Sequence, residues 1–213
     1  MSAARELRGG EVSQAIRRHR LIVVMRHIAP RERLLTLADE LADAGARAFE
    51  VTMDAPTAED DLAALRSHLA LRRDGPYLVG AGTVLHRQQL RAAHRARADF
   101  AVAPILDLGL LRESVEGGMP FIPGALTPTE IAAAWMAGAT FVKLFPASAV
   151  GAAMVRELRG PLPDIALIPT GGVDGANAAS FLQAGAAAVG IGGAIVRADA
   201  ATRRAIVQSA AAS

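Results

Sequence analysis

One lysine stands in an apolar stretch at residues 141–146, whose sequence is FVKLFP. Lys143 is the only lysine in a chain with 23 lysine and arginine residues in total. Arginine stays charged in proteins, whereas a desolvated lysine can lose its proton and become a nucleophile. Its position alone allows two interpretations: Lys143 is a nucleophile, or it extends its amine from a strand end into solvent.

A second charged residue, Glu50, lies in an equally apolar segment at residues 48–51. A charge flanked by apolar strand residues is either paired or functional. Glu50 and Lys143 therefore form either a buried structural ion pair or a catalytic pair in which the amine attacks a ketone and the carboxylate shuttles protons. Burial and the nearby positive charge of Arg26 would both favour the neutral amine that such an attack requires. We favour the catalytic pair.

A regular alternation of strands and helices must position these two residues. Eight short apolar segments have the length and pattern of buried strands, and helical patterns follow them. The expected strands are 21–25, 48–51, 77–81, 100–103, 121–123, 141–145, 166–168 and 187–191. Gly45, Gly118, Gly138 and Gly185 each stand just past a predicted helix and before a strand, where a left-handed helix cap is expected.

This alternation predicts an α/β protein with a parallel sheet, because uninterrupted apolar strands need cover on both faces. Eight strand–helix units favour a closed (β/α)8 TIM barrel over an open doubly wound sheet. We expect a single domain over residues 1–213, with the repeats at about 21–196. A short extra helix at 11–20 is expected to precede them.

The composition excludes several classes of protein. The chain has no cysteine, which rules out disulfides and thiolate chemistry, and its five histidines lack metal-binding spacing, so we expect no metal. The net charge is only +2 and aromatic residues make up 4%, which argues against a nucleic-acid partner. Residues 1–10 have no apolar signal-peptide core, and polar residues and glycines interrupt the longest uncharged run, 175–196. We therefore expect a cytoplasmic protein with no membrane partner.

In a barrel of this kind the active site lies at the C-terminal ends of the strands. Glycine pairs follow the seventh and eighth predicted strands at 171–172 and 192–193. Loops at these places commonly bind phosphate, because glycines let backbone N–H groups approach the oxygens. The alternative is that the glycines only permit tight turns, and we favour the phosphate site. The other residues that interrupt or end strands are Arg26, His27, Glu50, Thr83, Pro104 and Lys143.

Five segments, taken in order, resemble the KDPG/KHG aldolase family, the class I aldolases of 2-keto-3-deoxy-6-phosphogluconate and 4-hydroxy-2-oxoglutarate. They are FEVT at 49–52, GAGTVL at 80–85, FIPG at 121–124, VKLFPA at 142–147 and PTGGV at 169–173. Each motif is weak alone, but the ordered set is specific, and the resemblance covers about 21–196.

The resemblance implies a (β/α)8 barrel, usually a homotrimer, that reversibly cleaves a 2-keto-4-hydroxy acid to pyruvate and an aldehyde without a metal or other cofactor. It implies that Lys143 is the Schiff-base lysine and Glu50 the general acid/base. It also implies that Thr83 holds the pyruvate part, that Pro104 shapes its pocket, and that four glycines hold the substrate phosphate. Those glycines are Gly171, Gly172, Gly192 and Gly193.

Three departures from the family pattern concern the substrate more than the reaction. Many members carry an arginine where this chain has Asp54, whereas a phosphogalactonate-type branch carries one at the end of strand one, as Arg26 does here. We expect Arg26 to make a charge-assisted contact with the substrate carboxylate. The residue after Pro104 is Ile105 instead of glycine or asparagine, and Ala194 replaces a serine that would give the phosphate site a hydroxyl.

Two other interpretations remain at this point. Another phosphate-binding barrel enzyme, similar to thiamine phosphate synthase, would share the glycine loops but would not need a nucleophilic amine on strand six. A non-catalytic protein that binds sugar phosphates would need neither Lys143 nor Glu50. The gluconate-type, galactonate-type and non-phosphorylated keto acids all remain candidate substrates.

Overall fold

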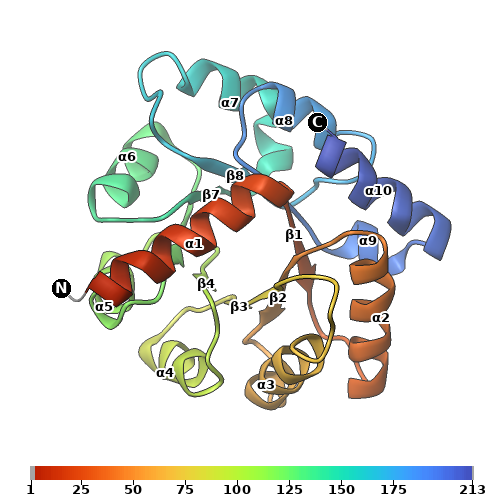
Figure 1. The fold of residues 1–213 in the computed structure, drawn as a ribbon. Coiled ribbons are helices and arrows are strands. Elements are labelled where there is room, and N and C mark those ends of the chain that lie inside the picture. Colours follow the sequence, from red (N-terminus) through yellow and green to blue (C-terminus); the bar gives the residue numbers. More distant parts are fainter. Residues whose placement is uncertain (1–2, 213) are drawn as a thin grey trace.

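The structure, a computed structural model, describes residues 3–212, and its strands and helices alternate along nearly the whole chain (Figure 1). The strands are β1 (Leu21–Met25), β2 (Ala48–Thr52), β3 (Leu78–Gly82), β4 (Ala101–Val102), β5 (Phe121–Ile122), β6 (Gly124–Ala125), β7 (Val142–Leu144), β8 (Leu167–Pro169) and β9 (Val189–Ile191). The helices are α1 (Ala3–His19), α2 (Arg31–Asp43), α3 (Ala58–Leu69), α4 (Arg87–Arg95), α5 (Leu108–Gly117), α6 (Pro128–Met136), α7 (Gly151–Leu158), α8 (Ala178–Gln183), α9 (Gly193–Arg197) and α10 (Ala200–Ala212), with a 3-10 turn η1 (Ala147–Ala149).

All strand pairs are parallel, as predicted, and the strands form a curled sheet in two hydrogen-bonded parts. The first part has the order β5-β4-β3-β2-β1-β9 and the second the order β6-β7-β8. Pro123, the last residue of the fifth predicted strand, separates β5 in the first part from β6 in the second, and β6 lies beyond the predicted end of that strand. Proline has no N–H to donate to a neighbouring strand, which explains why the ladder breaks there. An isolated parallel bridge between Thr170 and Gly190 links the end of β8 to β9.

The core has two layers, on the two faces of the strands. The larger layer lies between the strands and the surrounding helices, and includes Leu41, Leu65 and Val142. The smaller layer lies on the inner face and draws on strands of both parts of the sheet. Val12 and Ile16 of α1 belong to this inner layer, and Figure 1 shows α1 lying across the strands while the other helices surround them. The N-terminal helix is longer than the predicted segment 11–20, since it begins at Ala3.

The predicted helix caps are confirmed at all four glycines. Gly45, Gly118, Gly138 and Gly185 have φ angles of 111°, 82°, 96° and 103°, in the region that favours glycine. Thr127 and Glu130 form a capping box at the start of α6, and Asp107 accepts hydrogen bonds from the first turn of α5. These local signals fix where each helix begins and ends.

Candidate active site

The two-residue period of the strands explains which side chains reach the candidate site. Ala48 of β2 and Phe141, just before β7, belong to the inner core layer. Because side chains alternate between the two faces of a strand, Glu50 and Lys143 point to the same inner face, one step nearer the C-terminal ends. Glu50 stands opposite Val24 in the pairing of β2 with β1, and Val24 also faces inward.

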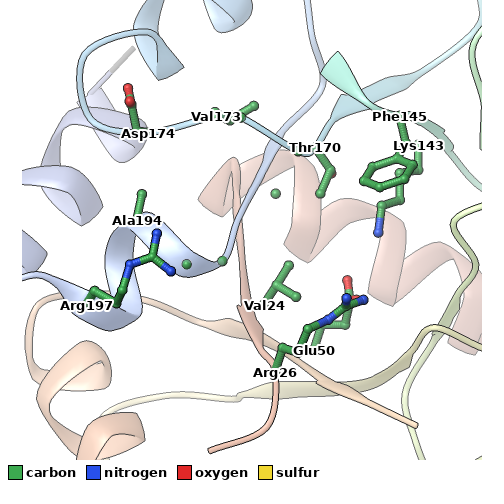
Figure 2. Close-up of a pocket in the computed structure, with 15 residues that line it drawn as sticks. Val24, Arg26, Glu50, Lys143, Phe145, Thr170, Val173, Asp174, Ala194 and Arg197 are labelled. Carbon is green, nitrogen blue, oxygen red and sulfur yellow. The ribbon is translucent and has the colours of Figure 1, made fainter. Parts of the chain in front are cut away.

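The inner face opens at the C-terminal ends of the strands into a cavity of about 420 Å³ (Figure 2). Both candidate catalytic residues line it, as do Arg26 and all four glycines of the predicted phosphate site. The full lining comprises Val24, Arg26, Glu50, Lys143, Phe145, Thr170, Gly171, Gly172, Val173, Asp174, Gly190, Gly192, Gly193, Ala194 and Arg197. Residues that are far apart in the sequence therefore meet in one cavity.

Glu50 is buried with an oxygen that has no hydrogen-bond partner. The residue is 2% exposed, and its Oε1 atom makes no hydrogen bond. A Cβ atom placed on Gly82 would lie 2.0 Å from that oxygen, so only glycine leaves room for this carboxylate. A buried carboxylate oxygen without a hydrogen bond destabilises the fold. Such a group is typical of a site at which a bound ligand supplies the missing partner.

Lys143 is also buried, at 6% exposed, and its amine lies 5.2 Å from the centre of the Phe145 ring. Figure 2 shows the amine directed into the cavity, toward the side that holds Arg26 and Glu50. Among the ion pairs within residues 3–212, none joins Lys143 to Glu50. The two residues thus face one cavity without forming the buried structural ion pair that the sequence also allowed.

Arg26 is held at the cavity edge by two neighbours. Its Nη2 atom donates a hydrogen bond to Thr83 Oγ1 at 2.9 Å, and its Nε atom lies 3.9 Å from Asp54 Oδ2. Thr83 has a left-handed backbone with φ 54° and is 8% exposed. Thr83 therefore contacts the cavity through Arg26.

Asp54 and His27 flank Arg26 on the outside, where His27 Nε2 lies 3.2 Å from Asp54 Oδ1. Partial burial works to raise the pKa of Asp54, but the neighbouring Thr52 hydroxyl and the charge of Arg26 outweigh it and hold that pKa below its ordinary value. A carboxylate that stays ionised keeps Arg26 oriented at the cavity edge. This role for Asp54 was not assigned from the sequence.

The glycines of the two loops serve different purposes. Gly171 and Gly172 have φ angles of 85° and 77°, so the backbone itself requires glycine there. Ser148 donates its backbone N–H to Gly171 O at 2.9 Å, which braces this loop against η1. Gly193 has no such backbone requirement, but the Arg197 guanidinium packs against it, with Nη1 2.6 Å from where a Cβ atom would stand.

Two predicted site residues, Thr83 and Pro104, lie outside the cavity lining, and several lining residues were not predicted. Pro104 packs its carbonyl against Gly124, where a Cβ atom would lie 2.3 Å away. Asp174 and Arg197 line the cavity, although no motif marked them in the sequence. The only signal for Arg197 was its place four residues after Gly193, on the same face of a helix.

The cavity therefore combines a buried amine, a buried carboxylate, two arginines and two glycine loops. Such a set can form a covalent imine with a ketone, move protons and bind anionic groups. Within residues 3–212, no three His, Cys, Asp or Glu side chains gather into a group that could hold a metal ion. Within the same residues, no helix is long and apolar enough to cross a membrane.

Comparisons with known proteins agree on one family. The family model described as KDPG and KHG aldolase matches residues 12–208. The chain is 35% identical, over 90% of its length and 91% of the relative's, to a 2-dehydro-3-deoxy-6-phosphogalactonate aldolase of Escherichia coli (strain K12). It is 38% identical to a 2-dehydro-3-deoxy-phosphogluconate aldolase of Pseudomonas aeruginosa, over 70% of this chain and 66% of that one.

A solved structure gives the same result at the level of the fold. KDPG aldolase from Legionella pneumophila, with pyruvate captured as a covalent carbinolamine intermediate, superposes with a TM-score of 0.80 at 29% identity. The match covers 94% of this chain and 96% of that one.

Proposed function

Because the chain belongs to the KDPG and KHG aldolase family, we propose that it is a class I aldolase that reversibly cleaves a 2-keto-4-hydroxy acid to pyruvate and an aldehyde. The expected substrate is 2-keto-3-deoxy-6-phosphogluconate or a close relative. One observation carries this proposal: the buried amine of Lys143 and the unpartnered carboxylate of Glu50 face one cavity without pairing with each other. Family membership disfavours the thiamine phosphate synthase-like alternative.

The reaction begins when the neutral Lys143 amine attacks C2 of the keto acid to form a carbinolamine. Glu50, acting as general acid, then gives a proton to the C2 hydroxyl, which leaves as water and forms an iminium ion. The iminium accepts the electron pair of the C3–C4 bond, so this bond breaks to give an enamine and an aldehyde. Glu50 takes the proton of the C4 hydroxyl as the bond breaks, and it then helps to protonate C3. Water finally attacks C2 of the iminium, Glu50 takes up the proton that this step releases, and pyruvate leaves while the neutral lysine is restored.

Other lining residues bind the substrate. Arg26, oriented by Thr83 and Asp54, receives the carboxylate of the keto acid as a charge-assisted contact. The backbone N–H groups around Gly171, Gly172, Gly192 and Gly193 receive the phosphate. Pro104 would then shape the pyruvate end only indirectly, through its contact with Gly124.

We also propose that the curled sheet closes into a full (β/α)8 barrel in solution, as one domain. Three observations support closure. Thr170 pairs with Gly190 between the two parts of the sheet, and β5 runs into β6 across Pro123. The inner core layer also joins Ile22, Ile122 and Ile168 from strands of both parts. Hydrogen exchange would test this, since closure protects the N–H groups of β8 and β9 together.

For the assembly we propose a homotrimer, located in the cytoplasm. Support for self-association comes from apolar side chains exposed near the C-terminal ends of the strands. Leu85, Ile105 and Leu108 are 42%, 54% and 36% exposed. Light scattering coupled to size exclusion would give the mass, and a monomer at micromolar concentration would refute the assembly.

Trapping with borohydride tests the aldolase directly. The protein is incubated with pyruvate, reduced and analysed by mass spectrometry before and after proteolysis. We expect a stable pyruvyl adduct on Lys143 and none in the Lys143→Met variant. If no adduct forms while sugar phosphates still bind, the chain is a binding protein and the proposed reaction is wrong.

A further inference from the structure

We propose that Arg197 is a specificity residue that binds the substrate phosphate and makes the enzyme prefer phosphorylated 2-keto-4-hydroxy acids. This inference rests on the proposed function, because it concerns the substrate of the same cavity. It addresses a feature left open by the sequence: Ala194 supplies no hydroxyl to the predicted phosphate site. A guanidinium group replaces that missing donor with several donors and a positive charge.

The position of Arg197 supports this role. It is the last residue of α9, one helical turn after Gly193, and it lines the cavity. Figure 2 shows its guanidinium directed toward the cavity, whereas the carboxylate of Asp174 points away from it. The arginine therefore lies at the glycine loops, where the phosphate is expected.

The guanidinium of Arg197 lies against Gly193. Unlike Gly171 and Gly172, Gly193 does not have a positive φ, so its backbone would accept other residues. A Cβ atom at this position would lie 2.6 Å from Nη1 and 3.0 Å from Nη2 of Arg197. The guanidinium therefore lies against the loop at Gly193, in the space that a side chain at this position would occupy.

The charges around the loops leave Arg197 available to an anion. Arg197 forms no ion pair within residues 3–212. The nearby carboxylate of Asp174 is engaged elsewhere, since Oδ1 accepts the backbone N–H groups of Ala176 at 2.9 Å and Asn177 at 3.2 Å. An arginine with free donors at a glycine loop is well suited to a phosphate, because its planar fork matches two phosphate oxygens.

The cavity therefore has two cationic side chains in addition to Lys143. They are Arg26, which directly follows β1, and Arg197, the last residue of α9. A keto acid whose carboxylate reaches Arg26 and whose far end carries a phosphate would satisfy both. A substrate without the phosphate would leave Arg197 without a partner. This arrangement assigns the substrate class as a 2-keto-4-hydroxy acid with an anionic phosphate at the end opposite the carboxylate.

The test compares two substrates in three variants. Cleavage of 2-keto-3-deoxy-6-phosphogluconate and of 4-hydroxy-2-oxoglutarate is followed through pyruvate release in wild type, Arg197→Gln, Arg197→Lys and the control Arg204→Gln. Arg204 is an exposed arginine of α10 outside the cavity lining. We expect Arg197→Gln to lower kcat/KM for the phosphorylated substrate by about 10- to 100-fold, as for a lost hydrogen bond to a charged group. Arg197→Lys should restore part of this loss, and the non-phosphorylated substrate should change less than about twofold.

The outcomes separate this inference from the proposed function. Equal losses on both substrates, no loss on the phosphorylated one, or a wild type that does not prefer it would each overturn the role of Arg197. Calorimetric titration with glycerol 3-phosphate gives a second measurement that needs no catalysis, and binding should weaken by a similar factor in Arg197→Gln alone. Failure to trap pyruvate on Lys143 in the wild type would refute the aldolase, while the titration would still decide the phosphate contact.

Discussion

Two cavities of similar size lie at opposite ends of the strands, and they differ in whether their charged residues form ion pairs. The cavity at the C-terminal ends has a volume of about 420 Å³ and holds Lys143 and Glu50 without an ion pair between them. The other, of about 430 Å³, is lined by residues that precede β4 and β5, together with Arg66 of α3. Volume alone would not tell which of the two is an active site.

In the second cavity the buried carboxylate of Asp99 is paired with Arg66. Arg66 Nη1 lies 2.7 Å from Asp99 Oδ2, and the same oxygen accepts the backbone N–H of Val79 at 2.9 Å. These bonds tie α3 to the start of β4 and to β3, so the charges stabilise the fold. The buried and unpaired charges of Lys143 and Glu50 identify the candidate active site. The paired charges of Asp99 and Arg66 stabilise the fold.

The largest expected effect comes from Lys143→Met, which keeps most of the apolar stem and removes the amine. We expect kcat to fall by about 10⁴-fold or more, because the covalent route is lost. Thermal unfolding should show no loss of stability, since the removed charge had no ion-pair partner to lose. A melting temperature that drops by many degrees would indicate that Lys143 is a structural residue after all.

The next effect is that of Glu50→Gln, which keeps the shape and removes the base. We expect kcat for cleavage to fall by about 10²- to 10⁴-fold, the usual range for a lost general acid or base. Glu113→Gln is a matched control, since Glu113 pairs with Arg87 at 2.8 Å on the outer surface. Activity of the control should stay within about twofold, and equal losses in both variants would contradict the special role of the inner carboxylate.

At the other end of the strands, Asp99→Asn should change stability and not activity. The variant leaves Arg66 without its carboxylate and weakens the bond from Val79. We expect the free energy of unfolding to fall by about 1–3 kcal/mol in urea titrations, as for a lost charge-assisted hydrogen bond. Unchanged kcat and KM per folded molecule would support a purely structural role for the Asp99 cavity. A selective loss of kcat would show that this cavity also takes part in the reaction.

The smallest expected effect is that of Arg26→Lys at the edge of the catalytic cavity. Lysine keeps the charge but not the planar fork, so we expect KM for the keto acid to rise by about tenfold while kcat changes less. Steady-state kinetics with saturating and limiting keto acid would measure both constants. An unchanged KM would show that Arg26 does not contact the carboxylate.

Much of this arrangement could be predicted because it depends on local patterns. Apolar strands of regular spacing give the strand–helix order, and a charge inside such a strand, as at Glu50 and Lys143, must face either the inner or the outer layer. The left-handed caps at Gly45 and Gly138 follow from turn chemistry alone. The family motifs then give these residues their expected roles.

Other features depend on contacts that no local pattern records. The N-terminal helix extends back from residue 11 to Ala3 across Gly9 and Gly10, although glycine disfavours a helix interior. The break between β5 and β6 at Pro123 requires knowledge of which neighbouring strand needs the missing N–H. Arg197 was missed because an arginine at the end of a short, exposed helix resembles any surface residue until its neighbours are known.

The tight fit between Gly82 and Glu50 has a consequence for how mutations in this chain would be tolerated. Any side chain at position 82 would collide with the carboxylate oxygen at 2.0 Å and push it out of place. In a saturation library selected for growth on a keto-acid substrate, position 82 should accept replacements as rarely as positions 50 and 143. A statistical ranking of indispensable positions would then place Gly82 among the reactive residues. Gly82 itself has no reactive group, and it only leaves room for the Glu50 carboxylate.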